Sequence, residues 1–295
     1  MKIVNFGSLN IDHVYQIEHF VQPGETIPSS GYQIHSGGKG LNQSIALARA
    51  GANVYHAGKI GREGEHLLAK LSEAGVDTTL ITTGDAPTGH AIIQVSSDGE
   101  NSIIVEGGAN RTITSSDVDR VMDTISDDDW LLLQNEINAI SLILEKTRDR
   151  PYSVVFNPAP MTPDIQHLPL ELVDILIINE VEGANLTNEH QPAAILDSLL
   201  NRYPAMQIVL TLGKLGAIYV DKNQRIDQEG FKVEAVDTTA AGDTFIGFFI
   251  ALLSSGSQVD EALRFACRAS SICATRPGAA DSIPFFDEVI SERLP

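Results

Sequence analysis

Asp243 lies in the segment of the sequence best suited to chemistry. It follows Ala240, Ala241 and Gly242 and precedes an apolar run, Phe245–Leu253, that is typical of a helix. A glycine in the first turn of a helix costs about 1 kcal/mol relative to alanine, so its presence indicates that a ligand approaches the backbone closely. Free N–H groups and the positive end of the helix dipole bind phosphate at such a place. A carboxylate beside that phosphate could accept the proton of a hydroxyl group.

A second interpretation of this segment is purely structural. Thr238 or Thr239 could cap the helix, and Asp243 could stabilise its start through the helix dipole. This interpretation explains the threonines and the aspartate but leaves Gly242 unexplained, so both interpretations stay open on the local sequence.

A glycine-rich segment is the second candidate. Gly37, Gly38 and Gly40 stand just before an expected helix, next to Lys39 and close to Asn42. The glycines allow a ligand to contact the backbone, and the asparagine offers both a donor and an acceptor to hydroxyl groups. The segment is not a P-loop, because no Ser or Thr follows the lysine. By itself it also fits an ordinary turn.

Asn179 and Glu182 follow the apolar run 173–178, at the end of a strand where ligands collect in open α/β sheets. An amide and a carboxylate there could hold hydrated Mg²⁺ and phosphate oxygens. The same two residues also fit a helix capping box.

The segment 211–216 follows another apolar strand. Gly213 and Gly216 would let its backbone contact a nucleotide, whereas the alternative is a simple strand-to-hairpin turn.

The pattern around these candidates predicts an α/β fold. Short apolar runs are typical of strands buried on both faces of a parallel sheet, and helical patterns such as 41–50 separate them. We therefore expect one domain over residues 1–295, with helices on both sides of a mostly parallel sheet. The expected strands are Lys2–Phe6, Val54–Ala57, Trp130–Gln134, Ser153–Asn157, Val173–Ile178 and Gln207–Thr211.

Two segments, 12–35 and 89–106, break this alternation. The β-rich runs His90–Ser96 and Ser102–Glu106 flank a hairpin turn signal, and the earlier segment is rich in Pro and Gly. We expect them to form a small antiparallel sheet that projects from the α/β body.

The composition excludes several classes of protein. Lys and Arg total 20 against 39 Asp and Glu, and the net charge of −19 argues against a protein that coats nucleic acid or an anionic membrane. The apolar runs are too short for a spanning helix, and the N-terminus has no secretion signal. Cys267 and Cys273 fit neither a disulfide framework nor a metal motif, which predicts two buried thiols in a reducing cytoplasm.

The four candidate segments occur in the order and spacing of a known family. The chain resembles the ribokinase-like, phosphofructokinase-B-type carbohydrate kinases over nearly its whole length, from Gly7 to Ala279. The most specific motifs are the Gly-Gly-Lys-Gly segment with Asn42 and the segment 237–243; the segments 107–110 and 156–160 also match. The resemblance implies a three-layer α/β/α fold in which the small sheet is a lid.

The resemblance also implies a role for each candidate residue. Asp243 would take the proton of the attacking hydroxyl, and the backbone N–H groups of Ala240, Ala241 and Gly242 would stabilise the transferred phosphoryl group. The sugar would be bound by Asn10, Asp12, Gly38, Lys39, Asn42, Glu136 and Asp243.

ATP, Mg²⁺ and a monovalent cation, K⁺, would be the cofactors by the same resemblance. The residues implied in nucleotide and Mg²⁺ binding are Asn179, Glu182, Thr211, Gly213, Lys214, Gly216, Gly242 and Cys267. The cation would be held, largely through carbonyl oxygens, by Asp237, Thr239, Cys273, Arg276, Gly278 and Ser282.

The expected reaction is the transfer of the γ-phosphoryl group of ATP to the 5-hydroxyl of D-ribose. The alternatives are a kinase of the same family that acts on 2-deoxyribose, a ketohexose or a nucleoside, and a sugar-binding regulator that has lost catalysis. A dinucleotide-dependent oxidoreductase is disfavoured, because no G-x-G-x-x-G follows the first strand. An exposed small sheet would favour a homodimer formed through the lid.

Overall fold

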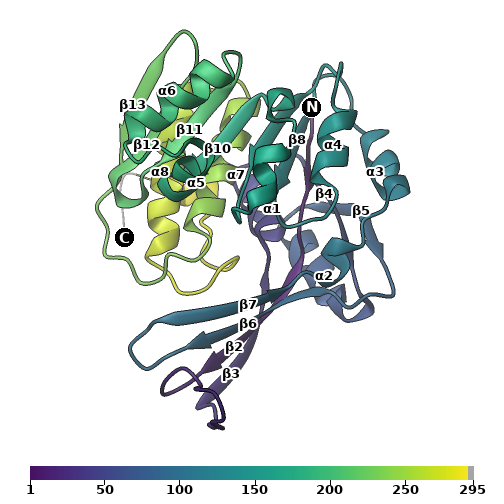
Figure 1. The fold of residues 1–295 in the computed structure, drawn as a ribbon, viewed down its shortest axis with the longest axis vertical. Helices are drawn as coiled ribbons and strands as arrows, with labels where there is room; N and C mark the ends of the chain where they lie inside the picture. The colour runs from purple at the N-terminus through teal and green to yellow at the C-terminus, as the bar shows by residue number, and fades with distance from the viewer. Residues whose placement is uncertain (292–295) are drawn as a thin grey trace.

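A nine-stranded sheet forms the centre of the molecule in the computed structural model, which describes residues 1–291 (Figure 1). Its strand order is β13-β12-β11-β10-β9-β8-β1-β4-β5. Neighbours from β11 to β5 are parallel, and β12 and β13 are added antiparallel at one edge. The strands are β1 (Ile3–Phe6), β4 (Val54–Ile60), β5 (Asp77–Thr83), β8 (Trp130–Gln134), β9 (Ser153–Asn157), β10 (Ile175–Asn179), β11 (Gln207–Thr211), β12 (Gly216–Val220) and β13 (Arg225–Glu229).

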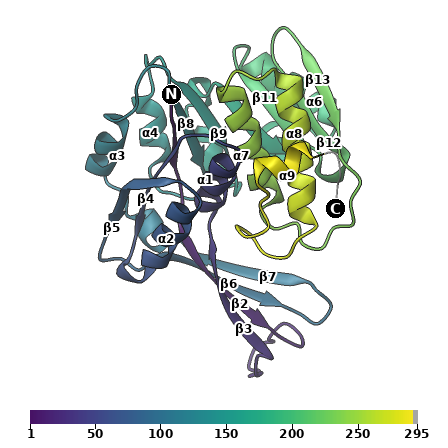
Figure 2. The ribbon, with the colours of Figure 1, turned by 180° about the vertical axis from the view of Figure 1, so that it is seen from behind.

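Helices cover both faces of this sheet, which confirms the expected three layers (Figures 1 and 2). One face is covered by α1 (Lys39–Arg49), α2 (Glu65–Glu73), α7 (Ala241–Ser254), α8 (Val259–Ala274) and α9 (Phe286–Ile290). The other is covered by α3 (Ser115–Met122), α4 (Ile140–Lys146), α5 (Glu180–Thr187) and α6 (Pro192–Arg202). Within residues 1–291, no helix is long and apolar enough to cross a membrane.

Neighbouring strand residues face opposite hydrophobic cores, as the period of two in a strand requires. Ile3 and Leu132 belong to the core under α1 and α7, whereas Val4 and Leu131 belong to the core under α3 and α4. All four side chains are almost completely buried. The strands buried on both faces are thus the ones whose apolar runs predict them, and all six expected strands are confirmed.

A second sheet projects away from the body (Figure 1). Its order is β3-β2-β6-β7, and its strands are β2 (Asn10–Gln16), β3 (Gly31–Gly37), β6 (Gly89–Val95) and β7 (Asn101–Glu106). The two outer pairings are antiparallel, as expected. The central pairing of β2 with β6 is parallel, because both strands leave the body in the same direction.

Close backbone contacts around α1 bring distant parts of the chain together. A Cβ on Gly40 would lie 2.4 Å from the Ser8 backbone nitrogen, and a Cβ on Gly247 would lie 2.3 Å from the Ala46 Cβ. Only glycine allows these approaches. The start of α1 is therefore held against the end of β1, and α7 packs directly on α1.

Candidate active site

A cavity of about 200 Å³ opens beside the carboxyl ends of β9, β10 and β11, the edge where ligands bind in open α/β sheets. The starts of α1, α5 and α7 contribute its charged residues, which are Lys39, Glu182 and Asp243. The cavity is lined by Lys39, Asn157, Ala159, Ile177, Ile178, Asn179, Glu182, Thr211, Thr238, Ala240, Gly242, Asp243 and Ile246.

The start of α7 has backbone groups available to an anion. The residue before the helix is Ala240 in the left-handed conformation (φ 61°), and no side chain caps the helix. The alternative interpretation, in which Thr238 or Thr239 caps the helix, is therefore wrong, because the left-handed residue leads the chain into the helix without a side-chain acceptor. Within residues 1–291, the N–H groups of Gly242 and Asp243 have no hydrogen-bond acceptor. A Cβ on Gly242 would meet nothing within 4 Å, so the space in front of this turn is open.

Two amides of α1 hold the carboxylate of Asp243. Asn42 Nδ2 donates to Oδ2 at 3.0 Å, and Gln43 Nε2 donates to Oδ1 at 2.9 Å. One donor on each oxygen fixes the plane of a carboxylate that is only 7% exposed. Asp243 therefore stands in one orientation at the cavity wall, next to the free N–H groups at the start of α7.

A buried polar network extends from Gln43 through the sheet. Gln134 Nε2 donates to Gln43 Oε1 at 2.7 Å and to Asn5 Oδ1 at 2.9 Å, and Asn5 Nδ2 donates to Ser44 Oγ at 2.8 Å. Ser44 Oγ in turn contacts His56 Nδ1 at 2.8 Å. Burial lowers the pKa of His56 to about 3, so this histidine is neutral at the end of the network.

Lys39 is the cation of the site. The negative charges of Asp243 first, and then of Glu136 and Glu182, raise its pKa, and together they outweigh the effect of burial. The lysine therefore stays protonated between three carboxylates, although the chain as a whole is strongly acidic. This position suits the neutralisation of a phosphate that enters the cavity.

The residues expected to bind the sugar gather around Lys39. Gly38 (φ 93°) brings the chain within close reach of β2, since its Cβ would lie 3.1 Å from the Asn10 nitrogen. Glu136 Oε2 accepts from the Lys39 backbone nitrogen at 2.9 Å and from the hydroxyl of Ser8. Burial and then the charge of Glu136 raise the pKa of Asp12 to about 7. Acceptors, donors and a cation thus face one another between the cavity and the small sheet.

The Asn179–Glu182 pair forms the expected capping box. Glu182 Oε2 accepts from the Asn179 nitrogen at 3.0 Å, and Asn179 Oδ1 accepts from the Glu182 nitrogen at 2.8 Å. Both residues also line the cavity. Burial raises the pKa of Glu182, and its carboxylate keeps further lone pairs for a hydrated cation. The capping box is confirmed, and the role of both residues in binding Mg²⁺ and phosphate stays a prediction.

The residues expected to bind nucleotide are distributed unevenly. Thr211 lines the cavity, whereas Gly213, Lys214 and Gly216 continue from it along the turn between β11 and β12. Cys267 lies in the hydrophobic core on α8, where burial raises the pKa of its thiol to about 12. Its side chain does not belong to the cavity wall.

Two loops and the last turn of α8 bring the expected cation ligands together. Asp237 accepts from the Gly278 nitrogen at 3.0 Å and from the Thr239 nitrogen at 2.9 Å. Cys273 Sγ lies 3.0 Å from Ser282 Oγ. The Arg276 side chain instead pairs with Glu288 at 2.5 Å, so only its backbone remains for a cation. In the described part of the chain, no three His, Cys, Asp or Glu side chains form a metal cluster.

Gln43, Ser8 and Asn157 are site residues that the motif analysis did not assign. Gln43 and Ser8 are fully buried, and Asn157 lines the cavity while its Oδ1 accepts from Gln43 Nε2 at 3.4 Å. A signal existed in the sequence, because Asn42, Gln43 and Ser44 are three successive polar residues inside a helix that should be buried.

The fold and the site define an α/β phosphotransferase, in which a buried carboxylate stands beside an open helix start at the sheet edge. Residues 1–285 match the profile of the pfkB family carbohydrate kinases. The chain belongs to this family of ATP-dependent carbohydrate kinases.

Relatives with known names agree with this assignment. The chain is 39% identical to a ribokinase of Staphylococcus aureus (strain COL), with 98% of each chain covered. It is similar to the structure of Arabidopsis thaliana ribokinase complexed with ribose and ATP, with 30% identity, a TM-score of 0.87, and 98% and 97% of the two chains covered. It is also similar to ribokinase from Cryptococcus neoformans var. grubii in complex with ADP, with 33% identity, a TM-score of 0.86 and 98% of each chain covered.

Proposed function

We propose that this carbohydrate kinase transfers the γ-phosphoryl group of ATP to the 5-hydroxyl of D-ribose, with Asp243 as the general base. One observation carries the proposal: the fixed carboxylate of Asp243 stands beside the free N–H groups at the start of α7. Relatives named ribokinase at 39% and 38% identity support ribose as the sugar.

The chemistry follows from this arrangement. Phosphoryl transfer requires an aligned hydroxyl and charge stabilisation on the phosphoryl oxygens. Asp243 orients the hydroxyl and takes its proton as the new P–O bond forms and the bond to ADP breaks. The N–H groups of Ala240, Gly242 and Asp243 would receive the negative phosphoryl oxygens. The expected contribution of Ala241 is wrong, because its N–H donates to the Thr238 carbonyl at 3.2 Å. Lys39 adds a positive charge on the opposite wall.

The donor sets suit the two metal ions as well. Glu182 and Asn179 would hold Mg²⁺ through its water shell, and the ion would neutralise phosphate charge. The loops around Asp237 and Cys273 offer carbonyl oxygens to a K⁺ ion, which would brace the start of α7.

The small sheet would act as a lid and as a dimer surface. Its strand β2 begins at Asn10, a residue of the proposed sugar site, so the sheet could exclude water from the reaction. Ile104 of β7 and its partner Ile92 of β6 lie on the same face of this sheet and are 65% and 38% exposed, an apolar surface that a second copy could cover. Sedimentation at several concentrations tests this homodimer. The two free thiols, Cys267 and Cys273, suit the reducing cytoplasm that we propose as its location.

ADP release with Mg²⁺ and K⁺ tests the reaction across D-ribose, 2-deoxyribose, fructose and several nucleosides. We expect the highest kcat/KM with D-ribose, and phosphorus NMR of the product should locate the phosphate on the 5-oxygen. A higher kcat/KM with another compound would make that compound the substrate in place of D-ribose. Sugar binding without turnover favours a regulator that has lost catalysis.

A further inference from the structure

We propose that Asn110 is a positioning residue that turns the amide of Asn10 so that its N–H groups point to the sugar. This inference rests on the proposed function and deepens it. Asn110 lies in a 3-10 turn, Gly108–Arg111, that follows the last strand of the small sheet, and it is 1% exposed.

The backbone determines the orientation of the Asn110 side chain. The Leu9 N–H can only donate, and it donates to Asn110 Oδ1 at 3.1 Å. The Leu9 carbonyl can only accept, and it accepts from Asn110 Nδ2 at 3.2 Å. The two amide atoms of Asn110 therefore cannot be exchanged.

The orientation of Asn10 follows from that of Asn110. Asn110 Nδ2 also donates to Asn10 Oδ1 at 2.8 Å, so the acceptor of the Asn10 amide is used. Within residues 1–291, Asn10 Nδ2 donates to no protein atom. A hydroxyl that gives its proton to the neighbouring Asp12 carboxylate needs a donor for its own oxygen, and Asn10 supplies that donor.

The surroundings keep Asn110 in place. A Cβ on Gly89 would lie 2.2 Å from Asn110 Nδ2 and 2.3 Å from Asn10 Oδ1, so backbone covers this hydrogen bond.

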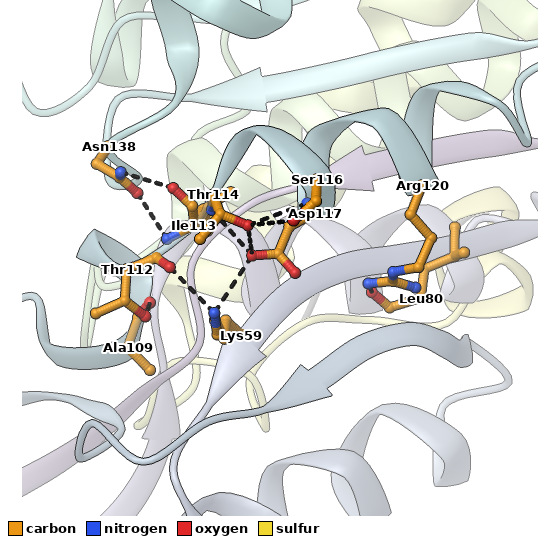
Figure 3. Close-up of polar contacts among 10 residues, drawn as sticks. All are labelled: Lys59, Leu80, Ala109, Thr112, Ile113, Thr114, Ser116, Asp117, Arg120 and Asn138. Atoms are coloured by element: carbon orange, nitrogen blue, oxygen red, sulfur yellow. Dashed lines mark hydrogen bonds and ion pairs between the residues drawn. The ribbon is translucent and has the colours of Figure 1, made fainter.

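Figure 3 shows the hydrogen bonds that hold the residues just after Asn110. Lys59 Nζ donates to the Thr112 carbonyl at 3.1 Å and contacts Asp117 Oδ2 at 3.3 Å. Asn138 Oδ1 accepts from the Ile113 N–H at 3.1 Å, and Asn138 Nδ2 donates to the Ile113 carbonyl at 2.9 Å. The residues after Asn110 are thus held by Lys59 of β4 and by Asn138, which lies between β8 and α4.

Asn110→Asp tests the inference by titration calorimetry with D-ribose and by steady-state kinetics. The new oxygen cannot donate, so the Asn10 amide turns over and presents its oxygen to the sugar. We expect the Kd and KM for D-ribose to rise about 10–100-fold, as for a buried polar contact left unpaired. The kcat and the KM for ATP should stay within about twofold.

Asn138→Asp is the matched control. It adds the same charge, and it breaks the same kind of side-chain grip on the backbone of the segment after Asn110 without touching Asn10. We expect it to lose comparable thermal stability while its KM for D-ribose stays within about twofold. Equal sugar constants in the two variants would overturn the inference.

Deoxy analogues separate positioning from general damage. Binding of 1-, 2- and 3-deoxy-D-ribose is measured in both proteins. For the analogue that lacks the hydroxyl bound by Asn10, Asn110→Asp should lower the affinity much less than it does for D-ribose. An equal loss with all sugars contradicts the inference. If Asn110→Asp does not fold, Gly89→Ala, whose methyl group displaces the same pair, must raise the KM for D-ribose, or the inference fails.

Measurements on the unchanged protein distinguish a failure of the proposed function from a failure of the role of Asn110. If it does not bind D-ribose, the proposed function fails and the inference fails with it. If it binds and phosphorylates D-ribose while the variants keep normal sugar constants, only the inference fails.

Discussion

Asp12→Asn should make the protein more stable at pH 8 and poorer at binding sugar. Burial and the charge of Glu136 raise the pKa of Asp12 to about 7 in the folded state, against 3.8 for the free group. The folded state therefore holds a proton that the unfolded chain releases between these two pH values. Folding stability contributed through this group is present at low pH and is lost as the pH rises through about 7.

The size of this effect follows from the shift. The difference between a pKa of 3.8 and one of about 7 corresponds to an upper limit of roughly 4 kcal/mol. Asp12 is only partly buried, and solvent screening reduces this figure to about 1–2 kcal/mol. The amide of asparagine has nearly the same shape and no charge, so the variant should gain about that free energy of unfolding at pH 8 and little at pH 4.

Urea unfolding of both proteins between pH 4 and pH 8 measures this difference. Asp98→Asn, which removes one exposed charge from the turn after β6, is the control for net charge. Equal changes in the two variants at pH 8 would refute the reasoning. In parallel, the KM of the unchanged protein for D-ribose should fall between pH 6 and pH 8 as Asp12 ionises, and Asp12→Asn should lose most of its sugar affinity.

Three further predictions concern the base and its surroundings. Asp243→Asn should keep sugar binding and lower kcat by roughly 10²–10⁴-fold; near-normal turnover in an ADP-release assay removes it as the base. Gln43→Leu should lower kcat about 10–100-fold and leave the KM for the sugar within about twofold, because the Asp243 carboxylate loses one of its two hydrogen-bond donors. An unchanged kcat in the same assay would mean that the hydrogen bond from Asn42 alone orients the carboxylate. Gly242→Ala should lower kcat without changing Tm, whereas Gly247→Ala should lower stability by about 1–3 kcal/mol, since only the second methyl group meets neighbouring atoms; calorimetric melting and kinetics on both variants check this, and the reverse pattern contradicts it.

The features that depend on local chemistry could be predicted from the sequence. The buried strands could be predicted from their apolar runs, because a strand covered on both faces is apolar over almost its whole length. The position of Asp243 in the first turn of a helix could be predicted from the small residues before it. The capping box of Glu182 could be predicted from the spacing alone.

Features set by tertiary contacts could not be predicted in this way. Ala240 adopts a conformation that alanine rarely takes, so nothing local separated it from a threonine-capped start. Asn5 and Gln134 each interrupt an apolar run, and only the assembled sheet brings them to Gln43. The parallel pairing of β2 with β6 depends on where both strands leave the body, which is a property of the whole fold.

The hydrogen bond between Asn42 and Asp243 joins residues that are 201 positions apart in the chain. One residue of this hydrogen bond is therefore synthesised early, and the other emerges from the ribosome only when most of the protein has been made. A nascent or truncated chain that ends before α7 would lack both the proposed base, Asp243, and the free N–H groups at the start of α7, so we expect it not to hydrolyse ATP. Activity thus reports on completion of the chain, and recovery of turnover during refolding should follow docking of α7 on α1 rather than formation of the parallel sheet.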